Sequence, residues 1–520
     1  MPSIKTAALV SLALLGAGTA VAAPRAGGQL VYAQSSFPPC LDVAQSARAQ
    51  NATRQILDTL VEQDRTTGAI LPWLATAWEW RDGGRELVLT LRRDVTFSNG
   101  EKLDAAAVQA NLDTLARLGR EGRASQAAGY LAGYQGSTVI DPATVSIRLA
   151  QPKAGFLQSL SEKTMAPLAP ETLAKTAEAR CAGALIGTGP FVITRVVQND
   201  RIELARRPDY AWASPNAGHA GPAWLDRITF LTVPEASVRV GSLVSGQVGA
   251  IDEVPTDAIP QIEAAGGRII ARTAGGVGVT LYPNVSRPLL TDARVRRALV
   301  IGIDRQELLS ALYTSYDHAA TSVLSSTVPG YVDLSDKLAY RPDEARRLLD
   351  AAGWTPGPDG IRRRDGQRLS LEVIWSFPGF TPDLELVKEQ LARIGVELRL
   401  GLRTDAEIGG IIRAGRFDLR MADLTRPDPD VLLSTFSSRY AAGITAPRPE
   451  LDALLDQQSL AIDPAARTAL VRRIQEKILD EGYGIPLRES STILATVPGL
   501  EGLWLSTPRW PVFHDARFTD

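Results

Sequence analysis

The chain has 520 residues, of which 45% are hydrophobic and 22% charged, and these proportions exclude a wholly disordered protein. At about 100–200 residues per domain, the length predicts two to four domains or lobes. Lys and Arg number 56 against 58 Asp and Glu, so no basic excess exists to neutralise a phosphate backbone, and we expect no nucleic-acid partner. With 3 His and 2 Cys, the sequence offers almost nothing for a zinc site or an iron–sulfur cluster. We therefore expect no metal and no cofactor.

The N-terminal segment, residues 1–23, predicts a cleaved secretory signal peptide. Lys5 precedes an apolar run from Ala7 to Leu15, which is too short to span a bilayer of about 30 Å. Small residues at 20–22 form a cleavage pattern, and no cysteine for a lipid anchor follows it. The alternative is an ordinary buried N-terminal helix. We expect an exported, soluble protein with no transmembrane span.

If the protein is exported, its two cysteines can form a disulfide, because an oxidising compartment allows a bond between Cys40 and Cys181. Such a bond closes a long loop and stabilises the fold by about 3–5 kcal/mol. The alternative is a pair of buried free thiols, and the sequence favours the disulfide because an exported chain rarely leaves its only pair unused.

The first half of the chain mixes strands, hairpins and helices. Residues 29–34 predict a strand, which Pro38 and Pro39 end. Apolar residues recur at helical spacing over residues 45–62, so we expect a helix there. Further along, the patterns predict a hairpin over 78–91, a helix over 104–118 with Asp104 as its N-cap, and a hairpin over 139–149.

The second half has a strand–helix–strand order. Residues 369–375 alternate as a strand, residues 384–394 have helical spacing, and residues 396–400 alternate again, which predicts a parallel βαβ unit. Other helices are expected over 292–301, 342–353 and 464–482. This order indicates a two-lobed α/β protein, whose ligands usually lie beyond the carboxyl ends of strands or between domains.

Familiar catalytic motifs are missing from the sequence. It contains no phosphate-binding G-x-x-x-x-G-K-[ST] loop, no G-x-S-x-G elbow and no H-E-x-x-H pair. His219, His318 and His514 lie far apart in sequence, and each is interpreted as a surface or core histidine. A pair of carboxylates for glycoside hydrolysis cannot be located from sequence, so an exported hydrolase stays an alternative.

Several groups of motifs occur in a fixed order between about residue 50 and residue 490. They are 56–61 with 71–78, 91–101, 187–191 with 207–210, 292–299 with 303–305, 345–354, and 415–418 with 427–430 and 485–487. Together they resemble the family 5 extracellular solute-binding proteins of ABC importers, a group that includes dipeptide-, oligopeptide-, glutathione- and nickel-chelate-binding proteins. We interpret these motifs mainly as scaffold, so they indicate the fold and not the solute.

The resemblance implies a two-lobed α/β periplasmic-binding-protein fold (type II, cluster C) with an extra subdomain in lobe I. Lobe I would comprise residues 24–275 and 485–520, with the extra subdomain over about 50–185, and lobe II would comprise residues 276–484. The crossings near residues 275 and 485 would act as hinges, and the closed form would be recognised by the permease subunits in the inner membrane. The resemblance also implies a monomer in the periplasm that performs no covalent chemistry.

Loops that follow strands are the expected lining of the cleft between the lobes. Trp375 and Phe377 would supply apolar walls, and Asp423 and Arg426 would supply fixed charges. The alternatives are core packing for the aromatic residues and a solvated loop for the charged ones. The full set of candidate ligand-binding residues is Ser36, Phe37, Trp375, Ser376, Phe377, Asp423, Thr425 and Arg426.

One departure from the family pattern concerns the ligand's ammonium group. Peptide-binding members place an aspartate three residues before the acidic residue of the Asp-Pro-like step, where this chain has Thr425 before Asp428. Either Asp423 shifts to reach the amine, or the ligand lacks that amine. Nickel-chelate members place a histidine where this chain has Asp430, which disfavours a histidine-assisted metal complex. We expect a small peptide-like or amino-acid-derived solute, with an opine, glutathione-like or metal-chelate ligand as the alternative.

Overall fold

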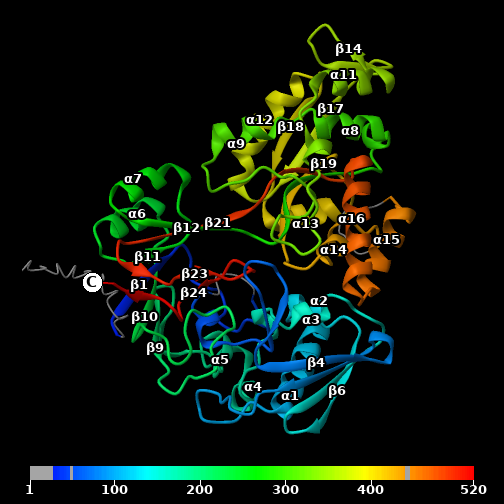
Figure 1. Cartoon of the computed structure of the whole chain (residues 1–520). Coiled ribbons are helices and arrows are strands. Elements are labelled where there is room, and N and C mark those ends of the chain that lie inside the picture. The colour runs from blue at the N-terminus through cyan, green and yellow to red at the C-terminus, as the bar shows by residue number, and fades with distance from the viewer. Residues whose placement is uncertain (1–26, 47–50, 440–445, 520) are drawn as a thin grey trace, which may run out of the picture.

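The computed structural model describes residues 27–46, 51–439 and 446–519, which form three main sheets (Figure 1). The five-stranded sheet lies above the other two in this view. The predicted signal peptide, residues 1–23, lies outside the described residues. The helices in the part of the chain that the structure describes are all too short or too polar to span a bilayer.

The seven-stranded sheet is mixed, with its three central strands parallel: β1 pairs in parallel with both β10 and β11. Helices α6 (Ala236–Val244) and α7 (Ile259–Ala264) bury an apolar cluster against one face, and Tyr32, Phe230 and Phe513 pack on the other. The predicted first strand is confirmed by β1. In sheet order, the strands are β12 (Arg268–Thr273), β21 (Ser491–Thr496), β11 (Ala250–Ile251), β1 (Gln29–Gln34), β10 (Arg227–Thr232), β9 (Arg201–Arg206) and β8 (Phe191–Val197).

A four-stranded antiparallel sheet packs beside it and confirms both predicted hairpins. Its order is β4 (Ala75–Arg81), β5 (Glu86–Leu91), β7 (Thr144–Leu149) and β6 (Tyr134–Asp141). The predicted helix is α1 (Ala105–Arg120), and the Asp104 side chain accepts a hydrogen bond from the Ala107 amide as its N-cap. Short helices complete this unit: α2 (Ser125–Tyr130), α3 (Phe156–Ser159), η3 (Lys163–Met165), α4 (Pro170–Leu173) and α5 (Ala177–Cys181).

The helix expected over residues 45–62 is wrong for the part that the structure describes. There the chain forms a single 3-10 turn, η1 (Thr53–Ile56), and then β2 (Val61–Gln63), which pairs with β3 (Ile70–Pro72). The apolar residues do not share one helical face, because Leu57 packs in the core of the seven-stranded sheet and Leu60 in that of the four-stranded sheet.

The five-stranded sheet has the order β18 (Glu397–Leu402), β17 (Ser370–Trp375), β19 (Leu419–Thr425), β13 (Gly276–Pro283) and β20 (Ile485–Arg488). β17 pairs in parallel with β18, and α12 (Thr381–Ala392) connects them, so the predicted βαβ unit is confirmed. Three other predicted helices are present as α8 (Ala293–Ile301), α11 (Pro342–Ala351) and α16 (Pro464–Asp480). The sheet is also covered by α9 (Arg305–Leu312), α13 (Asp405–Arg413), α14 (Val431–Phe436) and α15 (Pro449–Leu460).

The disulfide between Cys40 and Cys181 is present and spans 141 residues of sequence. It fastens the segment after β1 to α5, beside the four-stranded sheet. After β21 the C-terminal segment forms two small ladders of its own. These pair β22 (Leu500–Glu501) with β25 (Arg517–Phe518), and β23 (Trp504–Leu505) with β24 (Pro511–Val512).

The chain passes twice between the seven-stranded and the five-stranded sheets. One crossing is Ala274–Gly275, between β12 and β13, and the other is Glu489–Ser490, between β20 and β21. The Ala274 amide donates to the Ser490 carbonyl at 2.7 Å, so the two crossings are bonded to each other. The second crossing was expected near residue 485, but β20 still pairs with β13 in the five-stranded sheet, and the chain leaves that sheet only after Arg488.

Candidate functional site

The end of β19 is fixed to both crossings. The Ser490 hydroxyl donates to Asp423 Oδ2 at 2.9 Å, and the Arg426 amide donates to the Gly275 carbonyl at 2.9 Å. Asp423 and Thr425 were expected in a loop that follows a strand. This is wrong, because β19 itself continues to Thr425 by pairing with the start of β13. The predicted residues of this segment therefore lie beside the two crossings.

A glycine makes this close approach possible. Gly276 has φ of +149°, and a Cβ atom there would lie 2.1 Å from the Leu424 carbonyl oxygen. Any side chain at this position would push β19 away from β13. The backbone at the first crossing is thus held by a contact that only glycine permits.

Arg426 reaches from the end of β19 to the four-stranded unit. Its guanidinium lies 5.7 Å from the centre of the Tyr130 ring, and its Nη1 donates to Ser434 Oγ at 3.2 Å. Burial raises the pKa of Tyr130, and the charge on Glu162 raises it further. Arg426 is therefore one of the charged groups through which the two sides of the molecule meet.

Other hydrogen bonds close the same seam. Gln63 Nε2 donates to the Pro427 carbonyl at 3.1 Å, and the Ala154 amide donates to the Ser459 carbonyl at 2.8 Å. Both join the five-stranded side to the four-stranded unit, far in sequence from either crossing. The lobes are thus in contact both at the crossings and across the seam.

A buried lysine that the sequence reasoning missed lies in the four-stranded unit. Lys163 is 5% exposed, and its Nζ lies 3.5 Å from the centre of the Trp510 ring. Burial lowers the pKa of the Lys163 ammonium, which the neighbouring Glu162 opposes. No motif marks Lys163, and its pairing with Trp510 depends on the return of the C-terminal segment, so no sequence signal was available.

The remaining predicted residues have different surroundings. Trp375 is 2% exposed and packs in the core of the five-stranded sheet, whereas Phe377 is 61% exposed and meets Phe380 edge-on. Ser36 is exposed, and Phe37 packs against the core of the seven-stranded sheet. The structure thus brings together Asp423, Thr425 and Arg426 at one strand end, and Ser376 and Phe377 at the end of β17.

A carboxylate at the end of β11 holds the loop that carries Ser36 and Phe37. Asp252 accepts hydrogen bonds from the Ser35 amide at 2.9 Å and from Asn51 Nδ2 at 3.2 Å. Burial, followed by the charge on Glu253, raises the pKa of Asp252 to about 7. This residue is a positioning group for the loop after β1, and its protonation changes near neutral pH.

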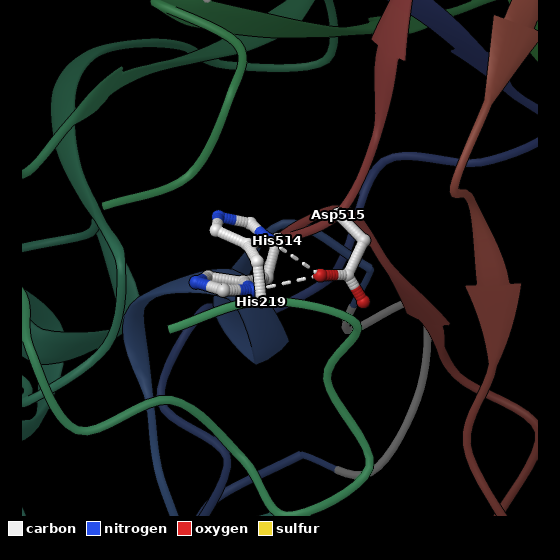
Figure 2. Close-up of side chains that lie close together, drawn as sticks. All are labelled: His219, His514 and Asp515. Atoms are coloured by element: carbon white, nitrogen blue, oxygen red, sulfur yellow. Dashed lines mark hydrogen bonds and ion pairs between the residues drawn. The ribbon is translucent and has the colours of Figure 1, made fainter. Parts of the chain in front are cut away.

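One cluster in the described part of the chain has metal-ligating side chains close together: His219, His514 and Asp515 (Figure 2). Asp515 Oδ1 lies 2.8 Å from His219 Nδ1 and 3.3 Å from His514 Nδ1, and the two rings stack at 4.2 Å. The Nε2 atoms face the carbonyl oxygens of Pro222 and Gly221 at 2.9 and 2.8 Å. Every ring nitrogen of these two histidines thus has a hydrogen-bond partner. The cluster joins residues 218–222 to the C-terminal segment, and we call it the clasp.

Comparison with known proteins identifies the family. The family model described as bacterial extracellular solute-binding proteins, family 5 middle, matches residues 69–443, which is more than half of the chain. The chain belongs to this family. Its fold is the two-lobed fold of family 5, and its function is that of a solute-binding protein of an ABC importer.

Relatives and a solved structure place this family 5 member among binding proteins. The glutathione-binding protein GsiB of Salmonella choleraesuis is 26% identical over 475 residues, covering 85% of each chain. The nickel-binding periplasmic protein of Escherichia coli is 25% identical over 468 residues, covering 86% of each chain. NikA from Brucella suis in complex with Fe(III)-EDTA superposes with a TM-score of 0.83 at 24% identity, over 95% of this chain and 100% of that one.

Proposed function

We propose that this protein is the exported periplasmic receptor of an ABC importer, which captures one small solute between its lobes and delivers it unchanged to a membrane permease. The solute is peptide-like or amino-acid-derived, and the receptor acts as a monomer without catalysis. The observation that carries this proposal is the pair of hydrogen-bonded crossings, Ala274–Gly275 and Glu489–Ser490, with polar side chains of both lobes gathered around them. Two lobes joined in this way close around ligands by hinge motion.

The permease recognises the protein when its two lobes have closed over the solute. A ligand shifts the open–closed equilibrium only by its greater affinity for the closed state, so it must contact both lobes. In the proposed site, Arg426, Thr425 and Phe377 belong to one lobe, and Ser36 and Phe37 to the other. Ser376 lies beside Phe377, whereas the buried Trp375 supports this loop from the core.

The charges around Arg426 favour a ligand with an acidic group. Among residues 27–46, 51–439 and 446–519, no carboxylate lies within ion-pair distance of the Arg426 guanidinium. A ligand carboxylate would complete this site with charge-assisted hydrogen bonds. Asp423 already accepts from Ser490, which supports a ligand whose α-ammonium is absent or is held elsewhere.

A second candidate follows from the same observation. Opines, glutathione-like molecules and metal chelates carry several carboxylates, and the relatives named for glutathione and nickel support this range. Mass spectrometry of the small molecule that co-purifies with the protein distinguishes these ligands from a simple peptide.

The test of the proposed function is ligand-stabilised melting over a panel of peptides, opines and chelates. At a concentration 100-fold above its Kd, the true solute should add about 2.7 kcal/mol to the free energy of unfolding. Arg426→Ala should lose this stabilisation, whereas Arg413→Ala, an exposed arginine of the same lobe, should keep it. Recovery of a chemically altered compound would instead support an exported hydrolase and reject the receptor.

A further inference from the structure

An open pocket of about 430 Å³ lies at the edge of the seven-stranded sheet, and none of its lining residues belongs to the Arg426 seam. It is formed by edge strand β12, by β23 of the C-terminal segment, by the turn between β2 and β3, and by the loop that carries Tyr316. Its volume is within the range of small-molecule sites. The side chains that give it a chemical character are Arg65, Arg268, Arg272, Tyr316 and Trp504.

Three arginines line this pocket. Arg268 and Arg272 are four residues apart on β12 and therefore point to the same face of the strand. Arg272 Nη2 donates to the Arg65 carbonyl at 2.7 Å, and the Arg65 guanidinium lies 5.3 Å from the centre of the Trp504 ring. In the described ranges, none of the three arginines has a carboxylate within ion-pair distance.

Two carboxylates beside the pocket, those of Asp64 and Glu263, already accept hydrogen bonds from other groups. Asp64 Oδ1 accepts from the amides of Thr66 and Thr67 at 2.8 and 2.6 Å and from the Thr67 hydroxyl at 2.9 Å. Glu263 Oε1 accepts from the Tyr316 hydroxyl at 2.9 Å. The positive charge at this pocket is therefore not offset by a direct pair.

One hydrogen-bond donor of the Arg272 side chain is unsatisfied. Its Nε is buried and has no hydrogen-bond partner. Burial, and then the charge of Arg65, lowers the pKa of the Arg272 guanidinium, and the charge of Asp64 opposes this effect. A buried donor without a partner is costly, and an anion at this place would remove that cost.

We propose that Arg65, Arg268 and Arg272 bind a small anion that carries carboxylate or phosphate groups, with Trp504 and Tyr316 as the walls of its site. This site goes beyond the proposed function, because it lies outside the seam at Arg426. Tyr316 follows α9 of the five-stranded lobe, and its carbonyl accepts from the Ser491 hydroxyl at 3.1 Å, beside the second crossing. An anion bound here would contact residues of both lobes close to the hinge.

The test is calorimetric titration of the full mature protein with citrate and, separately, with inorganic phosphate, each against sodium chloride of equal ionic strength. Binding should weaken at least tenfold in Arg268→Gln and in Arg268→Gln/Arg272→Gln. Arg227→Gln, an exposed arginine of the same sheet, should bind as the unaltered protein does. The anion that binds distinguishes a carboxylate site from a phosphate site.

Two results would overturn this inference. One is no heat beyond that of sodium chloride with either anion, and the other is equal affinity in Arg268→Gln and the unaltered protein. Arg268 is exposed, so its substitution leaves the fold intact, and circular dichroism checks this. Because Arg426→Ala tests the solute site alone, failure of the anion site and failure of the proposed function give different results.

Discussion

Asp423 on β19 accepts a 2.9 Å hydrogen bond from Ser490, the residue at which the chain crosses back to the first lobe. The sequence left two possibilities: either this carboxylate shifts to reach a ligand's ammonium group, or the ligand lacks that group. In the structure the carboxylate ties the end of β19 to the second crossing. The bond therefore links a strand end of the five-stranded sheet to the segment that runs between the two sheets.

Asp423→Ala and Ser490→Ala should weaken solute binding by similar amounts. Each removes the same hydrogen bond, worth about 1 kcal/mol or roughly a fivefold change in Kd, and the double variant should be little worse than either single one. Isothermal titration with the co-purifying solute measures all three. A loss of about 2–5 kcal/mol in Asp423→Ala with no effect in Ser490→Ala would show that Asp423 binds the solute directly.

The sequence pattern within a single segment was enough to predict those helices and strands that depend on that segment alone. The β17–α12–β18 unit and α1 with its Asp104 cap follow from alternation, helical spacing and capping. The end of β19 was not predictable, because its pairing partner β13 begins at Gly276, far away in sequence. Leu57 and Leu60 gave a helical pattern but serve two different cores.

The site was only partly predictable for the same reason. Asp423 and Arg426 were predicted as ligand contacts in a loop after a strand. The structure places Asp423 within β19 and both residues beside the crossings, and their contact with a ligand stays a prediction. Lys163 and Trp510 meet only because the C-terminal segment folds back, and the pairing of His219 with His514 likewise needs that return. Such contacts between distant segments leave no periodic signal in the sequence.

Asp252 should make stability depend on pH between about 4 and 7. Burial raises its folded pKa to about 7, above the ordinary value of about 3.9, so the folded protein keeps a proton that the unfolded chain releases. The free energy of unfolding should therefore fall as pH rises through this window, by at most about 1.4 kcal/mol per pH unit from this group. Urea unfolding across the window should show a flatter profile in Asp252→Asn, whereas the exposed Asp257→Asn should keep the original slope.

Reduction of the disulfide should destabilise the protein. The Cys40–Cys181 bond spans 141 residues, and a loop of this length predicts a loss of about 3–5 kcal/mol on opening. Thermal melting with and without reductant measures the loss, and Cys40→Ser/Cys181→Ser should melt at the reduced protein's temperature in both conditions. Two reactive thiols in the denatured, unreduced protein would contradict the bond.

The contribution of Asp515 to the free energy of unfolding should depend on pH in the opposite direction to that of Asp252. Burial alone would raise the pKa of Asp515, but hydrogen bonds from His514, the Gly218 amide and His219 hold it well below its ordinary value. Its stabilisation is therefore present above about pH 4 and is lost as the pH falls below that value. Asp515→Asn should cost about 2 kcal/mol at pH 7 and progressively less in acid. An equal cost at pH 7 and pH 3, measured by chemical unfolding, would contradict this account.

The central claim is that two lobes close over a solute and release it unchanged. Small-angle X-ray scattering of the protein, first stripped of its co-purifying solute and then supplied with it, tests this claim most directly. We predict a smaller radius of gyration with the solute bound, and a solute of unaltered mass on release. An identical scattering curve in both states, together with a chemically altered compound, would contradict the account.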